Sequence, residues 1–366
     1  RFMNVERVFN FSAGPAVLPE SVLAEAQRDL MTLPGLGMSV LELSHRSSTV
    51  VEIMETTATN IRTLADLSED FHVLFLQGGA SQQFAMVPLN LLPIDGSADY
   101  IVTGTWSKKA LKEARQFGNV RVAGSTESEG FVRIPANDEL DRADGAAYLH
   151  LTSNNTIYGT QWREMPETGA VPLVVDASSD IFSRPLEVAR RGLIYAGAQK
   201  NLGPAGVTLV IVHDELLRRS YPRSAVPTTL RYSTYADSGS LYNTPPVFPI
   251  YMVGLVTKWL LANGGLLAMA NRNENKARRL YTAIDRTEFY IGTATSDSRS
   301  LMNITFVLPN EDLETSFIEK AKEEGLVGLQ GHRSVGGLRV SIYNAFPEAG
   351  VDALVSFMTE FERTHG

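Results

Sequence analysis

The chain has 366 residues, of which 44% are hydrophobic and 20% charged, and its formal net charge is −8. This composition predicts a soluble globular enzyme with a substantial core, and the acidic balance argues against a nucleic-acid partner or an anionic membrane surface. No apolar run approaches the ~20 residues of a membrane span, and the lack of cysteine excludes disulfides, thiolate metal sites and cysteine nucleophiles and fits a reducing cytoplasm.

Short apolar runs alternate with helical patterns and predict a mostly parallel sheet that is buried on both faces. The predicted helices in this region cover residues 18–30, 50–67, 81–92 and 106–117. The predicted strands cover residues 72–77, 100–104, 120–124, 146–152, 172–176, 193–197 and 207–213. Ligands of such sheets bind beyond the carboxyl ends of the strands. The residues that fall there are Gly78, Gly104, Thr152, Asp176 and Lys200.

The last third of the chain predicts a smaller α/β unit. A helical stretch from 251 to 285 is interrupted at Gly264-Gly265, and strands at 303–308 and 338–343 alternate with helices at 312–324 and 347–363. We therefore expect a large domain of residues 16–264 and a small C-terminal domain of residues 265–366. Residues 1–15 are expected to join the small domain, since a strand-like segment at 9–11 ends at Gly14-Pro15.

Lys200 follows the apolar run 193–195 and has small neighbours. A lysine that is desolvated in such a place keeps a neutral amine, which can form a Schiff base with a carbonyl cofactor. Asp176 ends another apolar strand, and a lysine of this kind with an aspartate facing a pyridinium nitrogen is the protein's part of pyridoxal phosphate (PLP) chemistry. Either residue alone is more commonly a surface charge or a helix cap, but their joint position at strand ends favours a PLP site.

Two strand-to-helix junctions could contribute to the same site. The turn Gly78-Gly79-Ala80-Ser81 offers free amides and a helix dipole to a phosphate, although such turns also serve simply to reverse the chain. Trp106 at the next junction could cover one face of a pyridine ring or belong to the core. The segment 152–159 offers hydroxyls, one of which could meet the ring oxygen O3′, and is equally compatible with an ordinary polar loop.

Basic residues form two separate pairs, His45-Arg46 and His332-Arg333, and Arg339 lies on a predicted strand. Arginine binds carboxylate and phosphate bidentately, and histidine adds further donors. Each pair alone is more often a surface charge, but together they suggest a doubly anionic substrate. The six histidines lack the spacing of a metal site, so no metal is expected.

The chain resembles the phosphoserine aminotransferases, class V PLP enzymes of fold type I. The resemblance rests on segments that span nearly the whole chain in the expected order, at residues 11–16, 35–46, 78–81, 176–179, 197–201, 242–246 and 331–339. It implies reversible amino transfer between O-phospho-L-serine with 2-oxoglutarate and 3-phosphohydroxypyruvate with L-glutamate, in serine biosynthesis. The resemblance leaves open whether 4-phosphohydroxythreonine, in pyridoxine biosynthesis, is also a substrate.

The resemblance also implies roles for single residues around the cofactor. Lys200 would hold PLP covalently, Asp176 would pair with the pyridinium nitrogen, and Trp106 would stack on the ring. Thr156 would contact O3′. The cofactor phosphate would be bound by Ala80, Ser81 and Gln199, and by Asn243 and Thr244 of a second copy. A homodimer with shared active sites is therefore expected. Some similar enzymes carry a basic residue in place of Ser81, which leaves more of the phosphate charge to the helix dipole here.

For the substrate, the resemblance implies that Arg339 takes the α-carboxylate. The substrate phosphate would be surrounded by His45, Arg46, His332 and Arg333, some of them across the dimer interface. A class V aminotransferase acting on a smaller amino acid, such as serine or alanine with glyoxylate, is the nearest alternative, and the His-Arg pairs argue against it. A cysteine desulfurase is excluded because the chain has no cysteine. A non-catalytic cofactor-binding relative is disfavoured by the presence of Lys200 and Asp176.

Overall fold

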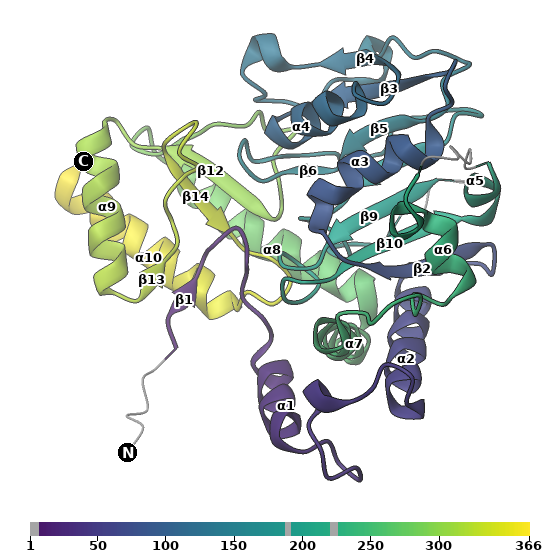
Figure 1. Ribbon diagram of the computed structural model, residues 1–366. Helices are drawn as coiled ribbons and strands as arrows, with labels where there is room; N and C mark the ends of the chain where they lie inside the picture. Colours follow the sequence, from purple (N-terminus) through teal and green to yellow (C-terminus); the bar gives the residue numbers. More distant parts are fainter. Residues whose placement is uncertain (1–6, 187–191, 220–225) are drawn as a thin grey trace.

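The computed structural model describes residues 7–186, 192–219 and 226–366, and its largest element is a seven-stranded sheet (Figure 1). The strand order is β2-β10-β9-β8-β5-β3-β4. The strands are β2 (Phe71–Leu76), β3 (Ser97–Val102), β4 (Asn119–Ser125), β5 (Leu149–Thr152), β8 (Leu173–Asp176), β9 (Leu193–Gly197) and β10 (Thr208–His213). Only β10 runs antiparallel to its neighbours within this sheet, so the prediction of a mostly parallel sheet is confirmed.

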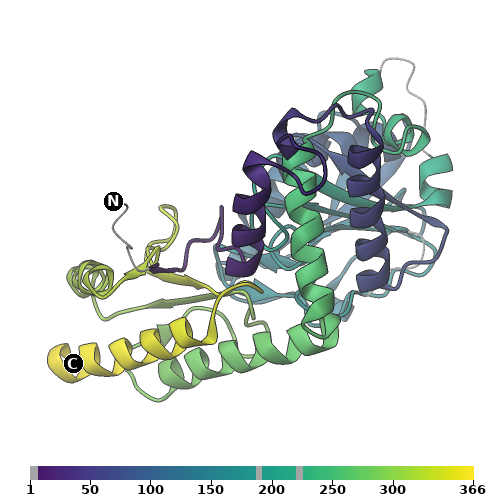
Figure 2. The same ribbon diagram turned by 90° about the horizontal axis from the view of Figure 1, so that it is seen from below.

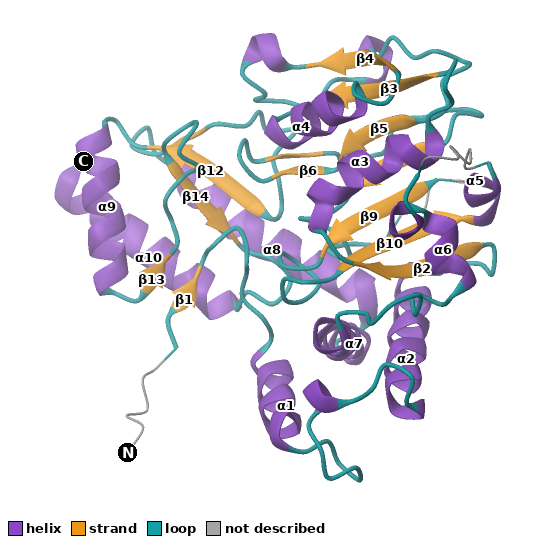
Figure 3. Cartoon of the chain, in the orientation of Figure 1, coloured by secondary structure: helices purple, strands orange, loops and turns teal. Residues whose placement is uncertain are grey.

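Helices cover both faces of the large sheet (Figure 3). On one face lie α3 (Gly79–Leu91), α4 (Thr105–Ala114) and α6 (Tyr232–Asp237), and on the other lie α1 (Glu20–Met31), α2 (Ser48–Ala65) and α7 (Val247–Ala262). Successive side chains of a strand point to opposite faces, so Leu193 and Tyr195 join one apolar cluster while Ile194 and Ala196 join the other. Burial on both faces explains why β9 is apolar at nearly every position.

The C-terminal part packs around a second, antiparallel sheet in the order β11-β12-β14. It consists of α8 (Gly265–Asp285), β11 (Ile291–Gly292), β12 (Asn303–Val307), α9 (Glu311–Glu323), β13 (Leu326–Val327), β14 (Leu338–Ser341) and α10 (Glu348–His365). Helices α8 and α10 lie side by side along it (Figure 2). The N-terminal strand β1 (Phe9–Asn10) pairs in parallel with β13. The domain boundary at residue 265 stays a prediction.

Several short elements were not expected from the sequence. They are α5 (Asp214–Arg218), α6, β11, β13 and the hairpin of β6 (Asn154–Asn155) with β7 (Thr160–Gln161). These elements are too short to show a hydrophobic period. Some predicted ends also shift: the strand expected from 146 begins at Leu149, and the Ala146 N–H instead closes a turn on the Ala143 carbonyl oxygen at 3.0 Å.

Among the described residues, no single helix has both the length and the apolar composition of a membrane span. Helices α7 and α8 reach both only when they are taken together, and they meet at an angle of 84°.

A buried group of amides joins the C-terminal part to the loops of the large sheet. The Asn344 backbone N–H donates to Asn201 Oδ1 at 2.9 Å, and Asn201 directly follows Lys200. Asn273 Nδ2, on α8, donates to Asn344 Oδ1 at 2.8 Å and to the Ser183 carbonyl oxygen at 2.9 Å. We refer to Asn201, Asn273 and Asn344 as the asparagine joint. It fixes the chain after β14 against the segment that carries Lys200.

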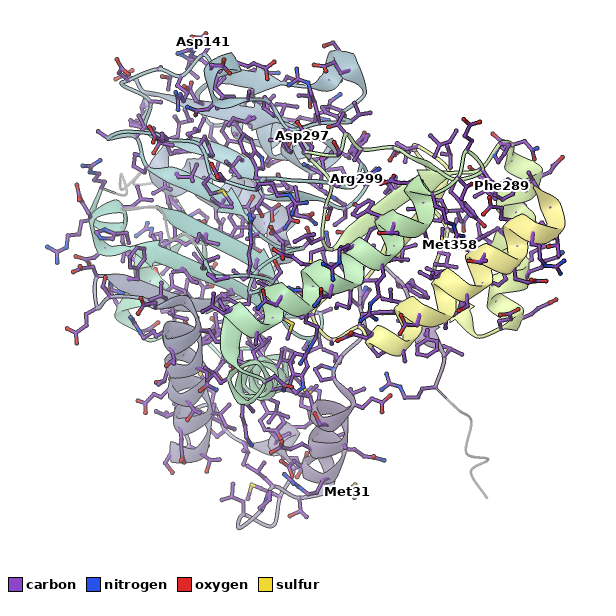
Figure 4. The ribbon with its side chains drawn as sticks, turned by 180° about the vertical axis from the view of Figure 1, so that it is seen from behind. Met31, Asp141, Phe289, Asp297, Arg299 and Met358 are labelled. Carbon is purple, nitrogen blue, oxygen red and sulfur yellow. The ribbon has the colours of Figure 1, made fainter. Side chains whose placement is uncertain are left out.

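A second connection lies at the back of the molecule, near Arg299 (Figure 4). Two guanidinium nitrogens of Arg299 donate to the carboxylate of Asp285 at 2.6 Å each, and the guanidinium lies 4.5 Å from the centre of the Tyr281 ring. The Gln161 N–H donates to the Ser298 carbonyl oxygen at 2.9 Å. The segment after β11 is thus held both to α8 and to the β6–β7 hairpin beside the large sheet.

Candidate cofactor site

A cavity of about 290 Å³ lies beyond the carboxyl ends of the strands of the large sheet. This is where ligands bind in sheets of this class. The structure brings together around it six of the residues predicted from the sequence, namely Ala80, Ser81, Trp106, Asp176, Gln199 and Lys200. Five further side chains complete the lining, and they are Phe84, Thr152, Asn154, Ser178 and Ser179.

Lys200 contributes its amine to this cavity. Its Nζ lies 5.3 Å from the centre of the Trp106 ring, and no described atom accepts a hydrogen bond from it. Burial is the main cause that lowers the pKa of Lys200 to about 8. The negative charge of Asp176 raises this pKa, and the positive charge of Arg339 lowers it. A sizeable fraction of the amine is therefore neutral near physiological pH, which a nucleophile or general base requires.

A second buried lysine shows what a purely structural lysine looks like in this fold. Burial lowers the pKa of Lys276 to about 7. Its Nζ, however, donates to the carbonyl oxygens of Ile342 at 3.0 Å, Tyr343 at 2.7 Å and Phe346 at 3.3 Å. All three donors are used in holding the chain after β14. Lys200 differs because its amine faces a cavity and has no such partners.

The stem of Lys200 is held by the N-terminal segment. A Cβ atom at Gly14 would lie only 3.1 Å from Lys200 Cγ, so the glycine backbone passes directly against the lysine. The Ala16 N–H donates to the Gln199 carbonyl oxygen at 2.9 Å, and the Tyr343 hydroxyl donates to the Ala13 carbonyl oxygen at 2.6 Å. The N-terminal segment thereby holds the stem of Lys200 so that its amine points into the cavity.

Asp176 is 4% exposed and ends β8 beside Lys200. Its Oδ1 accepts hydrogen bonds from the Ser178 backbone N–H at 3.0 Å and from Ser178 Oγ at 2.6 Å. Burial raises the pKa of Asp176, while the bonds from Ser178 and the charge of Lys200 pull it down. No described donor reaches its Oδ2, which is free to face a protonated ring nitrogen.

The first turn of α3 lines one end of the cavity and is suited to bind an anion. Gly78 and Gly79 take left-handed φ values of 88° and 65°, and no side chain caps the helix. The first N–H groups of an α-helix have no carbonyl partner within the helix, and the dipole there favours negative charge. A Cβ at Gly197 would meet Gln199 Oε1 at 2.9 Å and Ala80 N at 3.6 Å, so Gln199 converges on this turn.

Trp106 is fixed by the turn that leads from β3 into α4. Ser107 Oγ accepts hydrogen bonds from Thr103 N at 3.0 Å and Gly104 N at 3.1 Å. Trp106 Nε1 donates to Thr156 Oγ1 at 3.2 Å, so Thr156 orients the indole ring. The flat face of the ring is available to cover a planar cofactor.

Thr152 is a site residue that the sequence placed at a strand end, as one of several hydroxyls in the segment 152–159 that could meet O3′. It lines the cavity at the end of β5, opposite Asp176 in register. Its Oγ1 is buried and has no hydrogen-bond partner among the described atoms. An unpaired buried hydroxyl costs about 1–3 kcal/mol, and a polar atom of a bound ligand would supply the missing bond. The cavity thus offers an amine, a carboxylate, an aromatic face, a helix N-terminus and an unpaired hydroxyl. This set of groups fits PLP.

Arg339 stands beside this cavity, on β14. Its Nη1 donates to the Thr156 carbonyl oxygen at 3.4 Å, and its Nε is buried without a described partner. Burial lowers the pKa of Arg339. Burial lowers the pKa of His332. Three positive charges lower it further, and they belong to Arg339, Arg333 and Lys109, which therefore lie near His332.

The remaining predicted residues do not line the cavity. His45 Nδ1 and Thr244 Oγ1 lie within hydrogen-bond distance at 3.2 Å, while Arg46 and Asn243 are exposed on the same surface. Gln77 Nε2 donates to the Thr244 carbonyl oxygen at 3.4 Å, which links this surface to the strand before the α3 turn. Within the part of the chain that the structure describes, no group of three or more His, Cys, Asp or Glu residues is placed to hold a metal ion.

Comparisons with known proteins also indicate an aminotransferase. The sequence pattern of the family Aminotransferase class-V matches residues 8–354. A phosphoserine aminotransferase of Desulfosudis oleivorans is 55% identical over 363 residues, and one of Pseudomonas aeruginosa is 53% identical over 361 residues, with 99% of each chain covered in both cases.

Solved structures are similar over the same length. The phosphoserine aminotransferase from Bacillus circulans subsp. alkalophilus has a TM-score of 0.96 at 50% identity and covers 98% of this chain and 99% of its own. The PLP-bound phosphoserine aminotransferase from Trichomonas vaginalis has a TM-score of 0.91 at 37% identity and covers 96% of this chain and 100% of its own.

Proposed function

The chain belongs to the class-V aminotransferase family, and on this premise we propose that it is a PLP-dependent phosphoserine aminotransferase. It transfers the amino group between O-phospho-L-serine with 2-oxoglutarate and 3-phosphohydroxypyruvate with L-glutamate, in serine biosynthesis. The observation that carries the proposal is the unbonded amine of Lys200, which shares one cavity with Asp176 and lies beside a group of unpaired cations.

The residues of the cavity divide the work of the reaction. Bound PLP supplies an electron sink for the bond that breaks at the substrate Cα. With PLP bound, Lys200 Nζ would take the proton from the substrate Cα as general base and would deliver it to the cofactor carbon C4′ as general acid. The Asp176 carboxylate keeps the ring nitrogen protonated, and Ser178 holds that carboxylate in place. Trp106 covers one face of the ring and excludes water there.

Anion binding is shared between the two ends of the site. We assign the cofactor phosphate to Ala80, Ser81 and Gln199, which are supported by the uncapped start of α3. We assign the substrate α-carboxylate to Arg339, whose buried Nε lacks a partner among the described atoms. His332 and Arg333, with His45 and Arg46, would bind the substrate phosphate. 4-Phosphohydroxythreonine carries the same anionic groups, and we include it as a second substrate, in pyridoxine biosynthesis.

We further propose a homodimer in the cytoplasm, in which His45, Arg46, Asn243 and Thr244 act in the partner's site. These residues are at least partly exposed and lie outside their own chain's cavity. The same surface exposes Leu36, Met38 and Tyr242 and includes a groove of about 490 Å³ between residues 33–36, α2 and α7. Exposed apolar surface of this kind favours an interface. The cytoplasmic location rests on the absence of cysteine.

Mixing two defective variants tests the shared site. Lys200→Ala and Arg46→Ala proteins are each expected to be nearly inactive at low phosphoserine concentration. Subunit exchange between them should restore activity to about a quarter of the wild-type sites, since half of the dimers are mixed and each mixed dimer has one intact site. Activity that stays at the level of the separate variants after verified exchange would place Arg46 in its own chain's site.

The substrate is tested by adding O-phosphoserine, without a keto acid, to the PLP-loaded protein. We expect the visible band of the bound cofactor to fall and one equivalent of 3-phosphohydroxypyruvate per active site to be released. A response to glutamate or alanine but none to phosphoserine would keep the aminotransferase assignment and overturn the substrate. A protein that takes up no PLP would overturn the enzyme assignment itself.

A further inference from the structure

Lys109 is a basic residue beside the site to which neither the sequence nor the comparisons give a role. It lies on α4, three residues after Trp106, and residues three apart share one face of a helix. Its Nζ lies 4.7 Å from the centre of the Trp106 ring, closer than the 5.3 Å of Lys200 Nζ. Trp106 is therefore the common neighbour of the reacting amine and of Lys109.

The adjacent lysine offers a comparison for Lys109 on the same helix. Lys108 also is exposed, but its Nζ pairs with the carboxylate of Glu127. Lys109 forms no salt bridge with any described acidic residue. No side chain of the described residues therefore neutralises the charge of Lys109, although its exposed amine could reach an acidic partner.

The other cations at the site share this lack of acidic partners. Burial lowers the pKa of His332, and the positive charges of Arg339, Arg333 and Lys109 lower it further. No described carboxylate forms a salt bridge with His332 or with any of these three residues. Four basic groups that converge without an acid create a strongly positive region, which attracts a multiply charged anion.

We propose that Lys109 binds the phosphate of the substrate together with His332 and Arg333, and so helps the enzyme to prefer a dianionic side chain. The inference rests on the proposed function, because it concerns the phosphate of that substrate. A competing explanation is that Lys109 only packs on Trp106 through a cation–π contact and steadies the ring. The two roles differ in what they predict for substrates without a phosphate.

The test uses Lys109→Met and Lys108→Met, each in the PLP-loaded full-length protein. Methionine keeps an apolar stem against Trp106 but removes the charge. The amino-donor reaction is measured with O-phosphoserine and with L-serine, which differs only by the phosphate. We expect Lys109→Met to lower kcat/KM for phosphoserine about tenfold, mainly through KM, and to leave that for serine unchanged. Lys108→Met should match wild type with both.

Two further measurements separate charge from packing. Inorganic phosphate should inhibit the wild type competitively, and Lys109→Met should raise its inhibition constant by a similar factor. Lys109→Arg should restore most of the phosphoserine activity. Equal losses for phosphoserine and serine, or an altered cofactor spectrum, would assign Lys109 to the support of Trp106 instead. Identical behaviour of Lys109→Met and Lys108→Met would also overturn the inference.

These outcomes remain distinct from a failure of the proposed function. If the wild-type protein does not use phosphoserine, the substrate assignment and this inference both fall. If the wild type uses phosphoserine while Lys109→Met has an unchanged KM and phosphate inhibition, the inference alone falls.

Discussion

Replacing Lys200 by alanine is expected to lower kcat for amino transfer from phosphoserine to 2-oxoglutarate at least about 10³-fold. General base catalysis alone contributes about 10²–10⁴-fold, and the variant also loses the nucleophile that attaches the cofactor. The surroundings of Lys200 single it out for this role: its amine lines the cavity, its pKa falls to about 8, and no described atom accepts a hydrogen bond from it. No other described side chain in the cavity carries an amine.

A readout besides activity accompanies this prediction. Borohydride reduction should attach a phosphopyridoxyl group to the wild type and none to Lys200→Ala, as intact-mass measurement would detect. Added ethylamine should restore part of the activity of Lys200→Ala, because a free amine can enter the vacated space. Lys200→Arg keeps the charge but not the neutral amine, and it should stay inactive. Activity above a tenth of wild type in Lys200→Ala would contradict the assignment.

Replacing Asp176 by asparagine is expected to lower kcat about 10²–10³-fold, the range seen when one preorganised electrostatic group is removed. Asparagine has the same shape, so the two bonds from Ser178 to Oδ1 can persist. What is lost is the negative charge that keeps the ring nitrogen protonated. The measurement is kcat with saturating PLP, with the cofactor dissociation constant determined in parallel.

Ser178→Ala is the matched control for Asp176→Asn. It removes the hydroxyl bond of 2.6 Å but leaves the carboxylate and the backbone bond. We expect a smaller loss, about tenfold or less, since one hydrogen bond to a charged group is removed. If Ser178→Ala were as damaging as Asp176→Asn, or if Asp176→Asn were as active as wild type, the charge of Asp176 would not be the active element.

The sequence predicted the elements of the large sheet because buried strands leave a strong signal. Strand β9 was predicted with its observed bounds, since residues on both of its faces enter the core. The strand order and the antiparallel direction of β10 have no local signal, because they depend on which strands meet in space. The short hairpin of β6 and β7 was missed for lack of a hydrophobic period.

The candidate site was predictable to a similar extent. Lys200 and Asp176 stand out by their position after apolar strands, and the structure brings them into one cavity. Thr152 was also placed at a strand end, but it is distinguished from the other hydroxyls of its loop by its unpaired Oγ1, which is a property of the folded chain. Lys109 and Lys108 look alike in the sequence, and they differ because Glu127 lies near only one of them. The residues that we propose a second copy supplies leave no trace in a single chain's cavity.

Movement of the C-terminal part is constrained by the asparagine joint. Rotating α8 and β14 together against β9 would separate Asn344 from Asn201 and Asn273 from the Ser183 carbonyl oxygen, and each stranded buried amide costs about 1–3 kcal/mol. These bonds therefore oppose a change in the distance between Lys200, which precedes Asn201, and Arg339 on β14. With Arg339 proposed as the site of the α-carboxylate, we expect the enzyme to select substrates by the length between their carboxylate and the amine of Lys200.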